Sequence, residues 1–345
     1  MTTACSVMVG CGARAAQHLA AAAGAGVPVR GVFSRDAARR AVFAERHAVA
    51  GFGSLRAMIN TLRPEGVLLV TGPGPRAGLM EEVSALGVGW CLVEKPVATG
   101  VADWRRLAAL ERRAGTAGGT RFAVCHQFWF ERDLVRLRDA VARAGWARRV
   151  TMDGAMNPPG QGTHTLCYGR SLVGPAGDAG TAVAWVRGRA WGWDAADPDH
   201  AGPAGGAAEV GFVNGATGVW RAGHAAVRRG ADTQTVWQHV SVTAETDGGG
   251  AGGWAEFGPR GWAGGWRADF DGFSAADERN VAAQTSLLTA LRTGRVPTSL
   301  AAARHEWKAV LAWYASALNG ERVELRGWEP DPGLPERFRR AAAVG

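Results

Sequence analysis

The sequence predicts an α/β protein with a doubly wound parallel sheet at its N-terminus and a second, strand-rich domain after it. Over about the first 120 residues, short apolar runs alternate with helical patterns, which is typical of parallel sheets with helical crossovers. Beyond residue 149, runs rich in Val, Thr and Trp are broken by glycine clusters and indicate mainly strands. Because 345 residues exceed what one small core supports, two domains are expected, at 1–121 and 122–345.

Four short apolar runs predict the strands of the parallel sheet, at residues 7–9, 29–33, 67–70 and 90–93. Helical patterns follow three of these strands, at residues 14–23, from 36 onward and at 76–86. The carboxyl ends of parallel strands meet at one edge of the sheet, and ligands of open α/β sheets bind along this edge. Residues directly after each strand are therefore the first candidates for a site.

The second part of the chain mixes strands with helices. Residues 122–124 predict the first strand of the second domain, and residues 132–144 predict an amphipathic helix. The glycine-rich stretch 247–265 indicates hairpin turns or a mobile loop. Two long helices are predicted near the end, at 276–292 and 299–319, each with a glycine shortly after it.

Composition excludes several classes of function. The net charge is +8, but the arginines are dispersed, so an anionic cofactor or substrate is a better explanation than nucleic acid. No apolar run reaches the roughly 18–20 residues of a membrane helix, and the first residues lack the basic start of a signal peptide. Five scattered cysteines without metal-ligand spacing favour reduced thiols, no metal and a cytoplasmic protein.

The segment Gly10-Cys11-Gly12-Ala13-Arg14-Ala15 fits the dinucleotide-binding pattern G-x-G-x-x-G/A, directly after the first predicted strand. Gly10 would allow the tight turn, Gly12 would let a pyrophosphate approach the backbone, and the small Ala15 would let the helix pack closely on the strand. Ala13 and Arg14 open the helix, whose first N–H groups favour a phosphate. The alternative is a plain tight turn, but the position between strand and helix favours a cofactor.

The residues after the second strand predict which dinucleotide binds. Ser34 occupies the first position past this strand, where an NAD site usually has an acidic residue that binds the ribose 2′-hydroxyl. Serine can bind a 2′-phosphate instead, and Arg35 and Arg39 can pair with that phosphate. We therefore expect NADP, with NAD as the alternative if Asp36 binds the ribose. Asp36 is better placed as the N-cap of the following helix.

Lys95 is the most informative single residue. Of 39 basic residues only Lys95 and Lys308 are lysines, and Lys95 comes just after the predicted strand 90–93. Arginine stays charged at all relevant pH, whereas a buried lysine can lose its proton and act as an acid or base. The alternative is a surface lysine at the end of a strand.

These segments resemble the Gfo/Idh/MocA family (glucose–fructose oxidoreductase, inositol dehydrogenase and rhizopine catabolism proteins) over nearly the whole length of the chain. The matching segments are 10–15, 70–73, 93–98, 121–124, 161–166 and 291–297, of which Val93-Glu94-Lys95-Pro96-Val97-Ala98 is the most specific. The resemblance implies a Rossmann domain followed by an α+β domain with a large, open, mostly antiparallel sheet. It also implies NAD(P)-dependent redox chemistry on sugars, cyclitols or related polyhydroxy compounds.

The resemblance assigns roles to individual residues. Lys95 matches the family's catalytic lysine next to the nicotinamide, and Glu94 matches a position that contacts the cofactor. Thr71 and Pro73 lie in a matching cofactor-binding segment, and His164 matches the catalytic histidine of the Asp-x-Gly-x-His pattern. We expect Lys95 and His164 to handle the proton that accompanies hydride transfer.

The chain also departs from the family pattern. Gly160 stands where the family has the aspartate four residues before the histidine, and Cys167 stands where an acid usually follows it. In the Thr-Pro-Asn-x-x-His segment, Gly72 replaces the proline and Arg76 replaces the histidine. Asp153 is a candidate replacement for the missing carboxylate, although an acid on the surface of a strand is the alternative reading.

Further candidates could bind substrate. Asn157, Gln161 and His164 share a polar, proline-rich segment that indicates a rigid loop, and His126 follows the strand at 122–124. Many of the 15 tryptophans lie in the strand-rich half. They favour a subunit interface for most of these side chains and a pocket for one or two, and hence a homodimer or homotetramer.

The sequence therefore favours an NADP-preferring oxidoreductase that acts on a hydroxyl or carbonyl carbon of a sugar, cyclitol or similar compound. One alternative uses bound NAD as a transient oxidant for elimination or glycoside cleavage. The other is a non-catalytic regulator that senses a dinucleotide; Gly160 supports it, and the retention of Lys95 argues against it.

Overall fold

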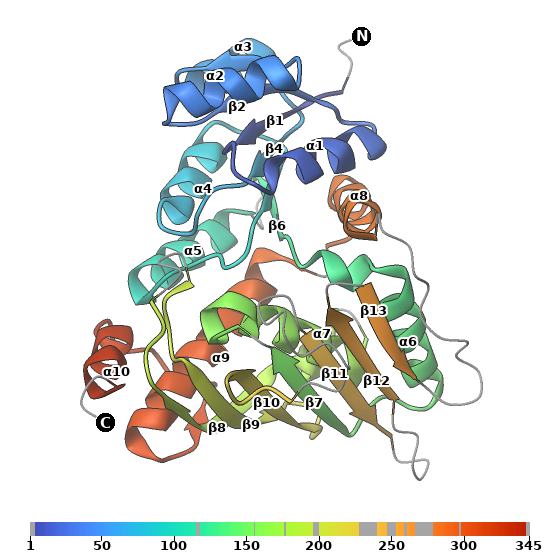
Figure 1. Cartoon of the computed structure of the whole chain (residues 1–345), viewed down its shortest axis with the longest axis vertical. Helices are drawn as coiled ribbons and strands as arrows, with labels where there is room; N and C mark the ends of the chain where they lie inside the picture. The colour runs from blue at the N-terminus through green and yellow to red at the C-terminus, as the bar shows by residue number, and fades with distance from the viewer. Residues whose placement is uncertain are drawn as a thin grey trace. The chain divides into compact units, whose positions relative to one another are not determined.

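The computed structural model describes residues 4–114, 118–154, 156–175, 177–195, 200–227, 240–246, 253–258, 261–265, 279–296 and 298–342 (Figure 1). The chain forms two compact units, neither of which is continuous in sequence. Unit 1 comprises Met1–Ala98, Arg105–Phe130 and Glu278–Ala301, and unit 2 comprises Thr99–Trp104, Glu131–Asp277 and Ala302–Gly345. Among the described residues, no helix is both long enough and apolar enough to cross a membrane.

Unit 1 is built on a parallel six-stranded sheet with the strand order β3-β2-β1-β4-β5-β6. The strands are β1 (Ser6–Val9), β2 (Val29–Phe33), β3 (Ala50–Phe52), β4 (Gly66–Leu69), β5 (Trp90–Val93) and β6 (Arg121–Val124). The strands β1, β4 and β5 are buried at every position, as expected of a parallel sheet covered on both faces. The strand order reverses between β1 and β4, which makes this edge the switch point where ligands bind.

The helices that cross between these strands are α1 (Ala15–Gly24), α2 (Ala37–Arg46), α3 (Leu55–Leu62), α4 (Arg76–Ala85) and α5 (Val101–Ala114). The predicted strands 29–33 and 90–93 coincide with β2 and β5. The sequence does not predict β3 or α3, because the Ala-Gly-Phe strand is too short for a periodic signal. The strand predicted to open the second domain needs a correction: β6 pairs in parallel with β5 and completes the first sheet.

The helix α8 (Arg279–Arg292) comes late in the chain, yet it belongs to unit 1. Its residues Leu287, Leu288 and Leu291 are buried in one core with Met8 and Leu92 of the sheet. The helix also packs on α1, where the Thr285 hydroxyl donates to the carbonyl of Ala21 at 3.3 Å.

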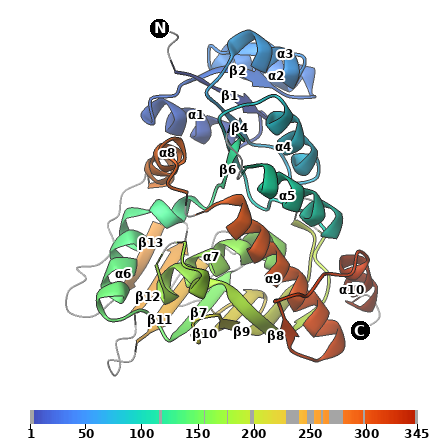
Figure 2. The same ribbon diagram turned by 180° about the vertical axis from the view of Figure 1, so that it is seen from behind.

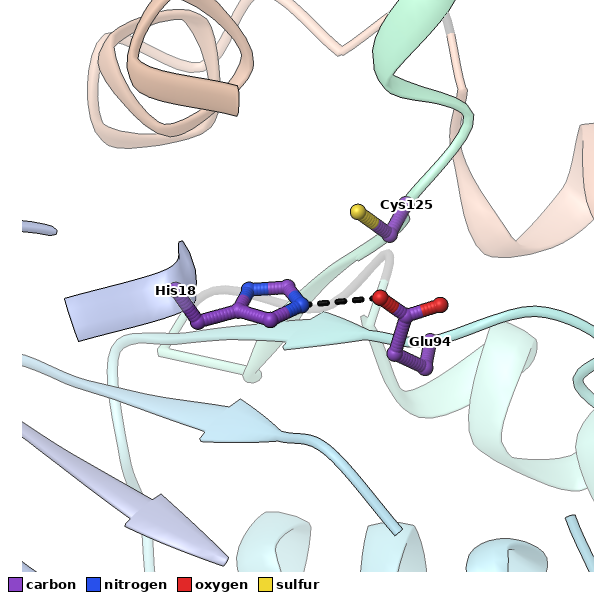
Figure 3. A group of neighbouring side chains, drawn as sticks. All are labelled: His18, Glu94 and Cys125. Atoms are coloured by element: carbon purple, nitrogen blue, oxygen red, sulfur yellow. Dashed lines mark hydrogen bonds and ion pairs between the residues drawn. The ribbon is translucent and has the colours of Figure 1, made fainter. Parts of the chain in front are cut away.

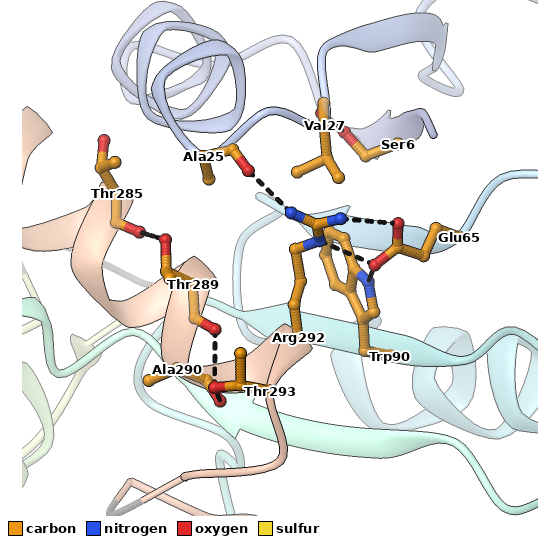
Figure 4. Close-up of polar contacts among 10 residues, drawn as sticks. All are labelled: Ser6, Ala25, Val27, Glu65, Trp90, Thr285, Thr289, Ala290, Arg292 and Thr293. Carbon is orange, nitrogen blue, oxygen red and sulfur yellow. Dashed lines mark hydrogen bonds and ion pairs between the residues drawn. The ribbon is translucent and has the colours of Figure 1, made fainter. Parts of the chain in front are cut away.

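The last residue of α8 fastens this helix to the sheet (Figure 4). Arg292 donates through Nε and Nη2 to the two carboxylate oxygens of Glu65, at 2.8 and 3.2 Å, and through Nη1 to the carbonyl of Ala25 at 2.9 Å. Glu65 Oε1 also accepts from Trp90 Nε1 at 3.0 Å. Two parallel N–H···O bonds to one carboxylate are stronger and more directional than a single bond. They hold the C-terminal end of α8 against the residue that precedes β4.

Unit 2 contains a mixed eight-stranded sheet with the order β13-β12-β11-β7-β10-β9-β8-β14. The strands are β7 (Arg149–Gly154), β8 (Val183–Trp191), β9 (Gly205–Phe212), β10 (Thr217–Gly223), β11 (Val240–Glu245), β12 (Gly253–Gly258), β13 (Gly261–Gly265) and β14 (Val323–Glu324). Only β10 and β7 pair in parallel among these neighbours. The predicted large, mostly antiparallel sheet is confirmed, and β12 and β13 form a hairpin pair within the glycine-rich stretch.

The helices of unit 2 are α6 (Arg132–Arg143), α7 (Thr163–Val173), α9 (Leu300–Asn319) and α10 (Leu334–Ala342). Figure 2 shows α9 along one face of the sheet, where Trp313 lies against Trp220 of β10 with ring centroids 4.7 Å apart. A Cβ at Gly188 or Gly206 would lie 2.8 or 2.9 Å from the Trp313 ring, so these glycines admit the indole. Trp220 is therefore a core residue and not one of the interface tryptophans that the sequence favours.

Candidate active site

The turn after β1 has the geometry that the dinucleotide pattern requires. Gly10 has a φ of 111°, and a Cβ there would lie 2.1 Å from the carbonyl oxygen of Val70, so only glycine fits. A Cβ at Gly12 would meet nothing within 4 Å, which leaves this stretch of backbone open to a ligand. Arg14 stands at the N-cap of α1 without a side-chain hydrogen bond to the first turn. The helix start therefore presents N–H groups and a positive dipole end to an anion.

The loop after β4 contributes a second feature of the same edge. The hydroxyl of Thr71 is buried and has no hydrogen-bond partner among the described residues. Buried hydroxyls are normally satisfied, so this atom fits a ligand that supplies a donor or acceptor. Together with the open backbone at Gly12, the residues of this edge fit a nicotinamide dinucleotide.

The residues after β2 form the candidate ribose site. Asp36 is the N-cap of α2, as the sequence predicts, and its Oδ1 accepts from the Arg39 backbone N–H at 2.9 Å. Arg35 and Arg39 are exposed, and Arg39 Nε lies 3.7 Å from Asp36 Oδ2. The carbonyl of Ser34 accepts from Arg40 Nη1 at 2.6 Å, which ties the strand end to the helix. The acidic residue thus caps a helix, while the serine and the two exposed arginines lie at the start of α2 beside it.

Lys95 follows β5 directly, and its side chain is half-buried. Burial lowers the pKa of Lys95; Glu94 raises it, and the positive charges of Arg14 and Arg76 lower it, which leaves a pKa of about 8. A lysine with this pKa can release and regain a proton near neutral pH, which an arginine at the same place cannot do.

Glu94 is ionised and held by a buried histidine (Figure 3). His18 of α1 is 1% exposed, and its Nε2 lies 2.8 Å from Glu94 Oε1. The other carboxylate oxygen accepts from the backbone N–H of Lys95 at 3.2 Å. Burial alone would raise the pKa of Glu94, but the hydrogen bond and charge of His18, with Arg76 and Lys95, lower it to about 2. Glu94 therefore brings a fixed negative charge next to Lys95.

Cys125, just after β6, completes this cluster, in which one polar atom from each of His18, Glu94 and Cys125 lies within 4.8 Å of the others. Burial, together with the charge of Glu94, raises the pKa of Cys125 well above that of an ordinary thiol, so the sulfur keeps its proton. The thiol donates to Gln127 Oε1 at 3.6 Å and accepts from Gln284 Nε2 at 3.5 Å. The Cys125 thiol thus contributes hydrogen bonds to this cluster.

Arg76 is the first residue of α4 and is only 2% exposed. Its Nη2 donates to the carbonyl of Thr71 in the loop after β4, and its Nη1 donates to the carbonyl of Pro96 in the loop after β5. One guanidinium thus connects the two loops that follow the central strands of unit 1.

In unit 2, His164 lies in the first turn of α7 and is 5% exposed. The sequence predicts a rigid polar loop here, and this prediction is wrong. Pro158–Gly162 form a helical turn that leads into α7, and Asn157 caps it by accepting from the Gly160 N–H at 2.9 Å. Proline at the start of the turn favours helical φ angles, and neither the prolines nor the glycines give the apolar periodicity that identifies a helix.

Tyr168 is a hydrogen-bond partner of His164. Its hydroxyl oxygen lies 3.1 Å from His164 Nδ1, and both side chains are buried one helical turn apart. A Cβ at Gly160 would lie 2.8 Å from Met156 Cε, so a side chain at residue 160 would require Met156 to shift. Asp153, the other candidate, is buried and bound by Arg221 at 2.7 and 3.0 Å. It serves an ion pair within the sheet.

The remaining predicted substrate residues are distributed as follows. His126 follows β6 in unit 1 and is 1% exposed. Asn157 donates from Nδ2 to the carbonyl of His200 at 2.6 Å, so both ends of its amide hold backbone in place. The side chain of Gln161 lies outside the described residues.

The sequence reasoning missed His18, Tyr168 and the bridging role of Arg76. His18 is a polar residue on an alanine-rich helix, three positions after Ala15 on the same face, which could have identified it as a buried partner. Tyr168 lies four residues after His164, which is a contact distance only on a helix. Because the segment reads as a loop, that spacing carried no signal.

Comparison with known proteins agrees with this geometry. A family model described as an oxidoreductase family with an NAD-binding Rossmann fold, GFO_IDH_MocA, matches residues 6–120. This range contains the turn at Gly10, the loop after β4 and the Glu94-Lys95-Pro96 segment. Among curated proteins, none matches the sequence.

Several solved structures share the fold over almost the entire chain. An oxidoreductase from Agrobacterium radiobacter in complex with NAD⁺, L-tartaric acid and magnesium has a TM-score of 0.71 at 17% identity, covering 94% of this chain and 99% of its own. The WlbA dehydrogenase from Bordetella pertussis in complex with NADH and UDP-GlcNAcA has a TM-score of 0.68 at 19% identity, covering 92% and 98%. An NAD-binding oxidoreductase from Klebsiella pneumoniae has a TM-score of 0.74 at 15% identity, covering 93% and 99%. At these identities the likeness concerns the fold.

Proposed function

Since this chain is a Gfo/Idh/MocA oxidoreductase by its Rossmann domain, we propose that it transfers hydride to or from a hydroxyl or carbonyl carbon of a sugar, cyclitol or similar polyhydroxy compound. The observation that carries the proposal is Lys95, which follows β5 with a pKa of about 8 beside the ionised Glu94. Chemistry at an alcohol carbon needs such a group, because the hydroxyl proton must leave as hydride is removed.

The roles of the residues follow from this chemistry. A nicotinamide dinucleotide bound along the Gly10–Gly12 turn supplies the hydride acceptor or donor. Neutral Lys95 takes the proton from the substrate hydroxyl during oxidation, and protonated Lys95 returns it during reduction. His164 assists by a hydrogen bond to the reacting oxygen, with Tyr168 holding its Nδ1. Glu94 keeps a negative charge next to the protonated lysine and so limits how far the pKa of Lys95 falls.

NADP is the preferred cofactor in this proposal. Its support is the pair Ser34 and Arg35 at the end of β2, together with Asp36, whose carboxylate caps α2. NADPH should therefore bind more tightly than NADH in a fluorescence titration. Arg35→Ala should weaken NADPH binding by roughly 1.5–3 kcal/mol, the scale of a hydrogen bond to a charged group, and leave NADH nearly unchanged.

Arg46, exposed at the other end of α2, gives the matched control for this titration. Arg46→Ala also removes one positive charge but should not distinguish the two cofactors. Tighter binding of NADH than NADPH by the unmodified protein would contradict the NADP assignment and leave the redox proposal standing. A panel of sugars, sugar acids and cyclitols, followed by absorbance at the reduced nicotinamide band, then tests the substrate class.

The protein is further proposed to form a homo-oligomer through the sheet of unit 2. Trp191, the last residue of β8, is 47% exposed, and Trp185 is half-buried with the Arg322 guanidinium 4.7 Å from its ring. Exposed indoles of this kind are enriched in interfaces. Light scattering at micromolar concentration should give a multiple of the chain mass, and a monomer would contradict the proposal.

A further inference from the structure

Arg76 is the least expected charged residue of unit 1. It is 2% exposed, although arginine is almost never fully buried unless it is paired. It also occupies the first position of α4, where the positive end of the helix dipole disfavours a cation. Its guanidinium donates to the carbonyls of Thr71 and Pro96. The helix dipole does not explain an arginine at this place, so a function that uses both the reach and the charge of arginine is the better explanation.

The two carbonyls identify that function. Thr71 lies two residues beyond the end of β4, and Pro96 is the residue directly after Lys95. The planar guanidinium donates to both at once, so it fixes the loop that carries Lys95 against the loop of the neighbouring strand. A flexible ammonium or an imidazole at this position could not span the two carbonyls with the same fork geometry.

We propose that Arg76 is the positioning residue for Lys95: it ties the Lys95-Pro96 segment to the Thr71 loop and keeps a permanent positive charge beside the lysine. The proposal rests on the role of Lys95 in the proposed function. It also gives a reason why arginine stands where the resemblance predicts histidine. A histidine would lose most of its charge at the pH where Lys95 works.

Titratable groups from four parts of unit 1 act on the pKa of Lys95. Glu94 at the end of β5 and Cys125 after β6 raise the pKa of the lysine, while Arg14 of α1 and Arg76 of α4 lower it. Burial is the largest influence and acts in the same direction as the two arginines. Removing the charge of Arg76 should therefore raise the pKa of Lys95, and removing that of Glu94 should lower it.

The lysine content of the chain makes a direct measurement possible. Lys95 and Lys308 are the two lysines, so protein labelled with ¹³C- and ¹⁵N-lysine gives two sets of side-chain NMR signals, which Lys308→Arg assigns. In Arg76→Gln the titration of Lys95 should move upward by on the order of 1 pH unit. Glu94→Gln should move it downward. Arg292→Gln removes another arginine that donates to a carbonyl in the same unit, and it should leave Lys95 unchanged.

Arg76→His provides a second variant in case Arg76→Gln does not fold, and it should give the same upward shift because histidine is neutral at pH 8. The rising limb of the pH profile for alcohol oxidation should move with the NMR pKa. An unchanged Lys95 titration in a folded Arg76 variant would overturn the proposal. The titration needs no substrate, so it tests the role of Arg76 without measuring turnover. The proposed function has a separate test, because a fully active Lys95→Arg protein would contradict it.

Discussion

The two candidate catalytic side chains lie in opposite kinds of surroundings. Lys95 of unit 1 is surrounded by charged groups, with Glu94 held by His18 and with Arg14 and Arg76 acting on its pKa. In unit 2, the hydroxyl oxygen of Tyr168 lies 3.1 Å from His164 Nδ1. The protonation of Lys95 therefore depends on burial and on neighbouring charges, whereas His164 makes a hydrogen bond within its own helix.

The same contrast appears in how closely each region follows the family pattern. Around Lys95 the characteristic segment Val93-Glu94-Lys95-Pro96 is intact, and the change to Arg76 adds a charge to the network. Around His164 the carboxylate is lost, and Met156 fills the space that a side chain at residue 160 would need. The family pattern is therefore kept in the segment around Lys95 of unit 1, and it is altered in the segment before His164 of unit 2.

The largest effect should come from Lys95→Arg. This change keeps the positive charge but removes the ability to exchange a proton near pH 8, so kcat should fall by about 10²–10⁴-fold. Steady-state kinetics with the best substrate of the panel would measure it. Lys308→Arg is the matched control, because it changes the other lysine, which lies in unit 2 over the ring of Trp104. Turnover at the unmodified rate in Lys95→Arg would show that the lysine is not the acid or base.

His164→Asn should be slower by on the order of 10²-fold, at the lower end of the usual contribution of proton-transfer residues. If His164 and Lys95 act on one oxygen, the double variant should be less than additively worse than the two single variants. A double-mutant cycle on kcat/KM measures this coupling. If the effects of the two single variants on kcat/KM add exactly, the two residues act independently, and His164 has a role other than proton transfer.

Lys95→Met should stabilise the protein at neutral pH. The folded pKa of about 8 lies below the ordinary value of about 10.4, so below pH 8 the lysine is charged in both states and burying it carries its full cost. Between these two values the unfolded state binds more protons, and the stability of the unmodified protein rises with pH. Urea unfolding at pH 7 should favour Lys95→Met by about 1–3 kcal/mol, and the difference should shrink near pH 10.5. A constant difference would refute the lowered pKa.

The smallest effect should come from Tyr168→Phe. Loss of one hydrogen bond to His164 Nδ1 should reduce kcat/KM by about 3- to 10-fold and shift the pH profile, with the fold intact. The only other tyrosine offers a matched control, because Tyr314 Oη is buried without a partner among the described residues. Tyr314→Phe should leave the pH profile unchanged and the stability equal or higher. Equal profiles for both variants would show that Tyr168 does not orient His164.

Much of unit 1 could be predicted because its signals are local. Buried parallel strands appear as continuous apolar runs, and the turn at Gly10 must be glycine since a Cβ would collide with Val70. The position of Lys95 follows from its place one residue beyond Glu94 at the end of β5, since parallel strands end at the ligand edge. Asp36 as a helix cap likewise depends on residues three positions apart.

Only the tertiary structure decided the remainder. The pairing of β6 with β5 and the packing of α8 on α1 and Glu65 could not be predicted from the sequence. Contacts between segments far apart in the chain leave no signal in local periodicity. The contacts of His18 with Glu94, and of Arg76 with the carbonyls of Thr71 and Pro96, join separate crossovers of the sheet. By itself, then, the sequence determined the fold class, the cofactor turn and the candidate lysine, each of which depends on residues close along the chain. The groups that act on the pKa of Lys95, and the tyrosine that contacts His164, reach these residues only in the folded chain. Burial strengthens such polar contacts because the local dielectric constant is low.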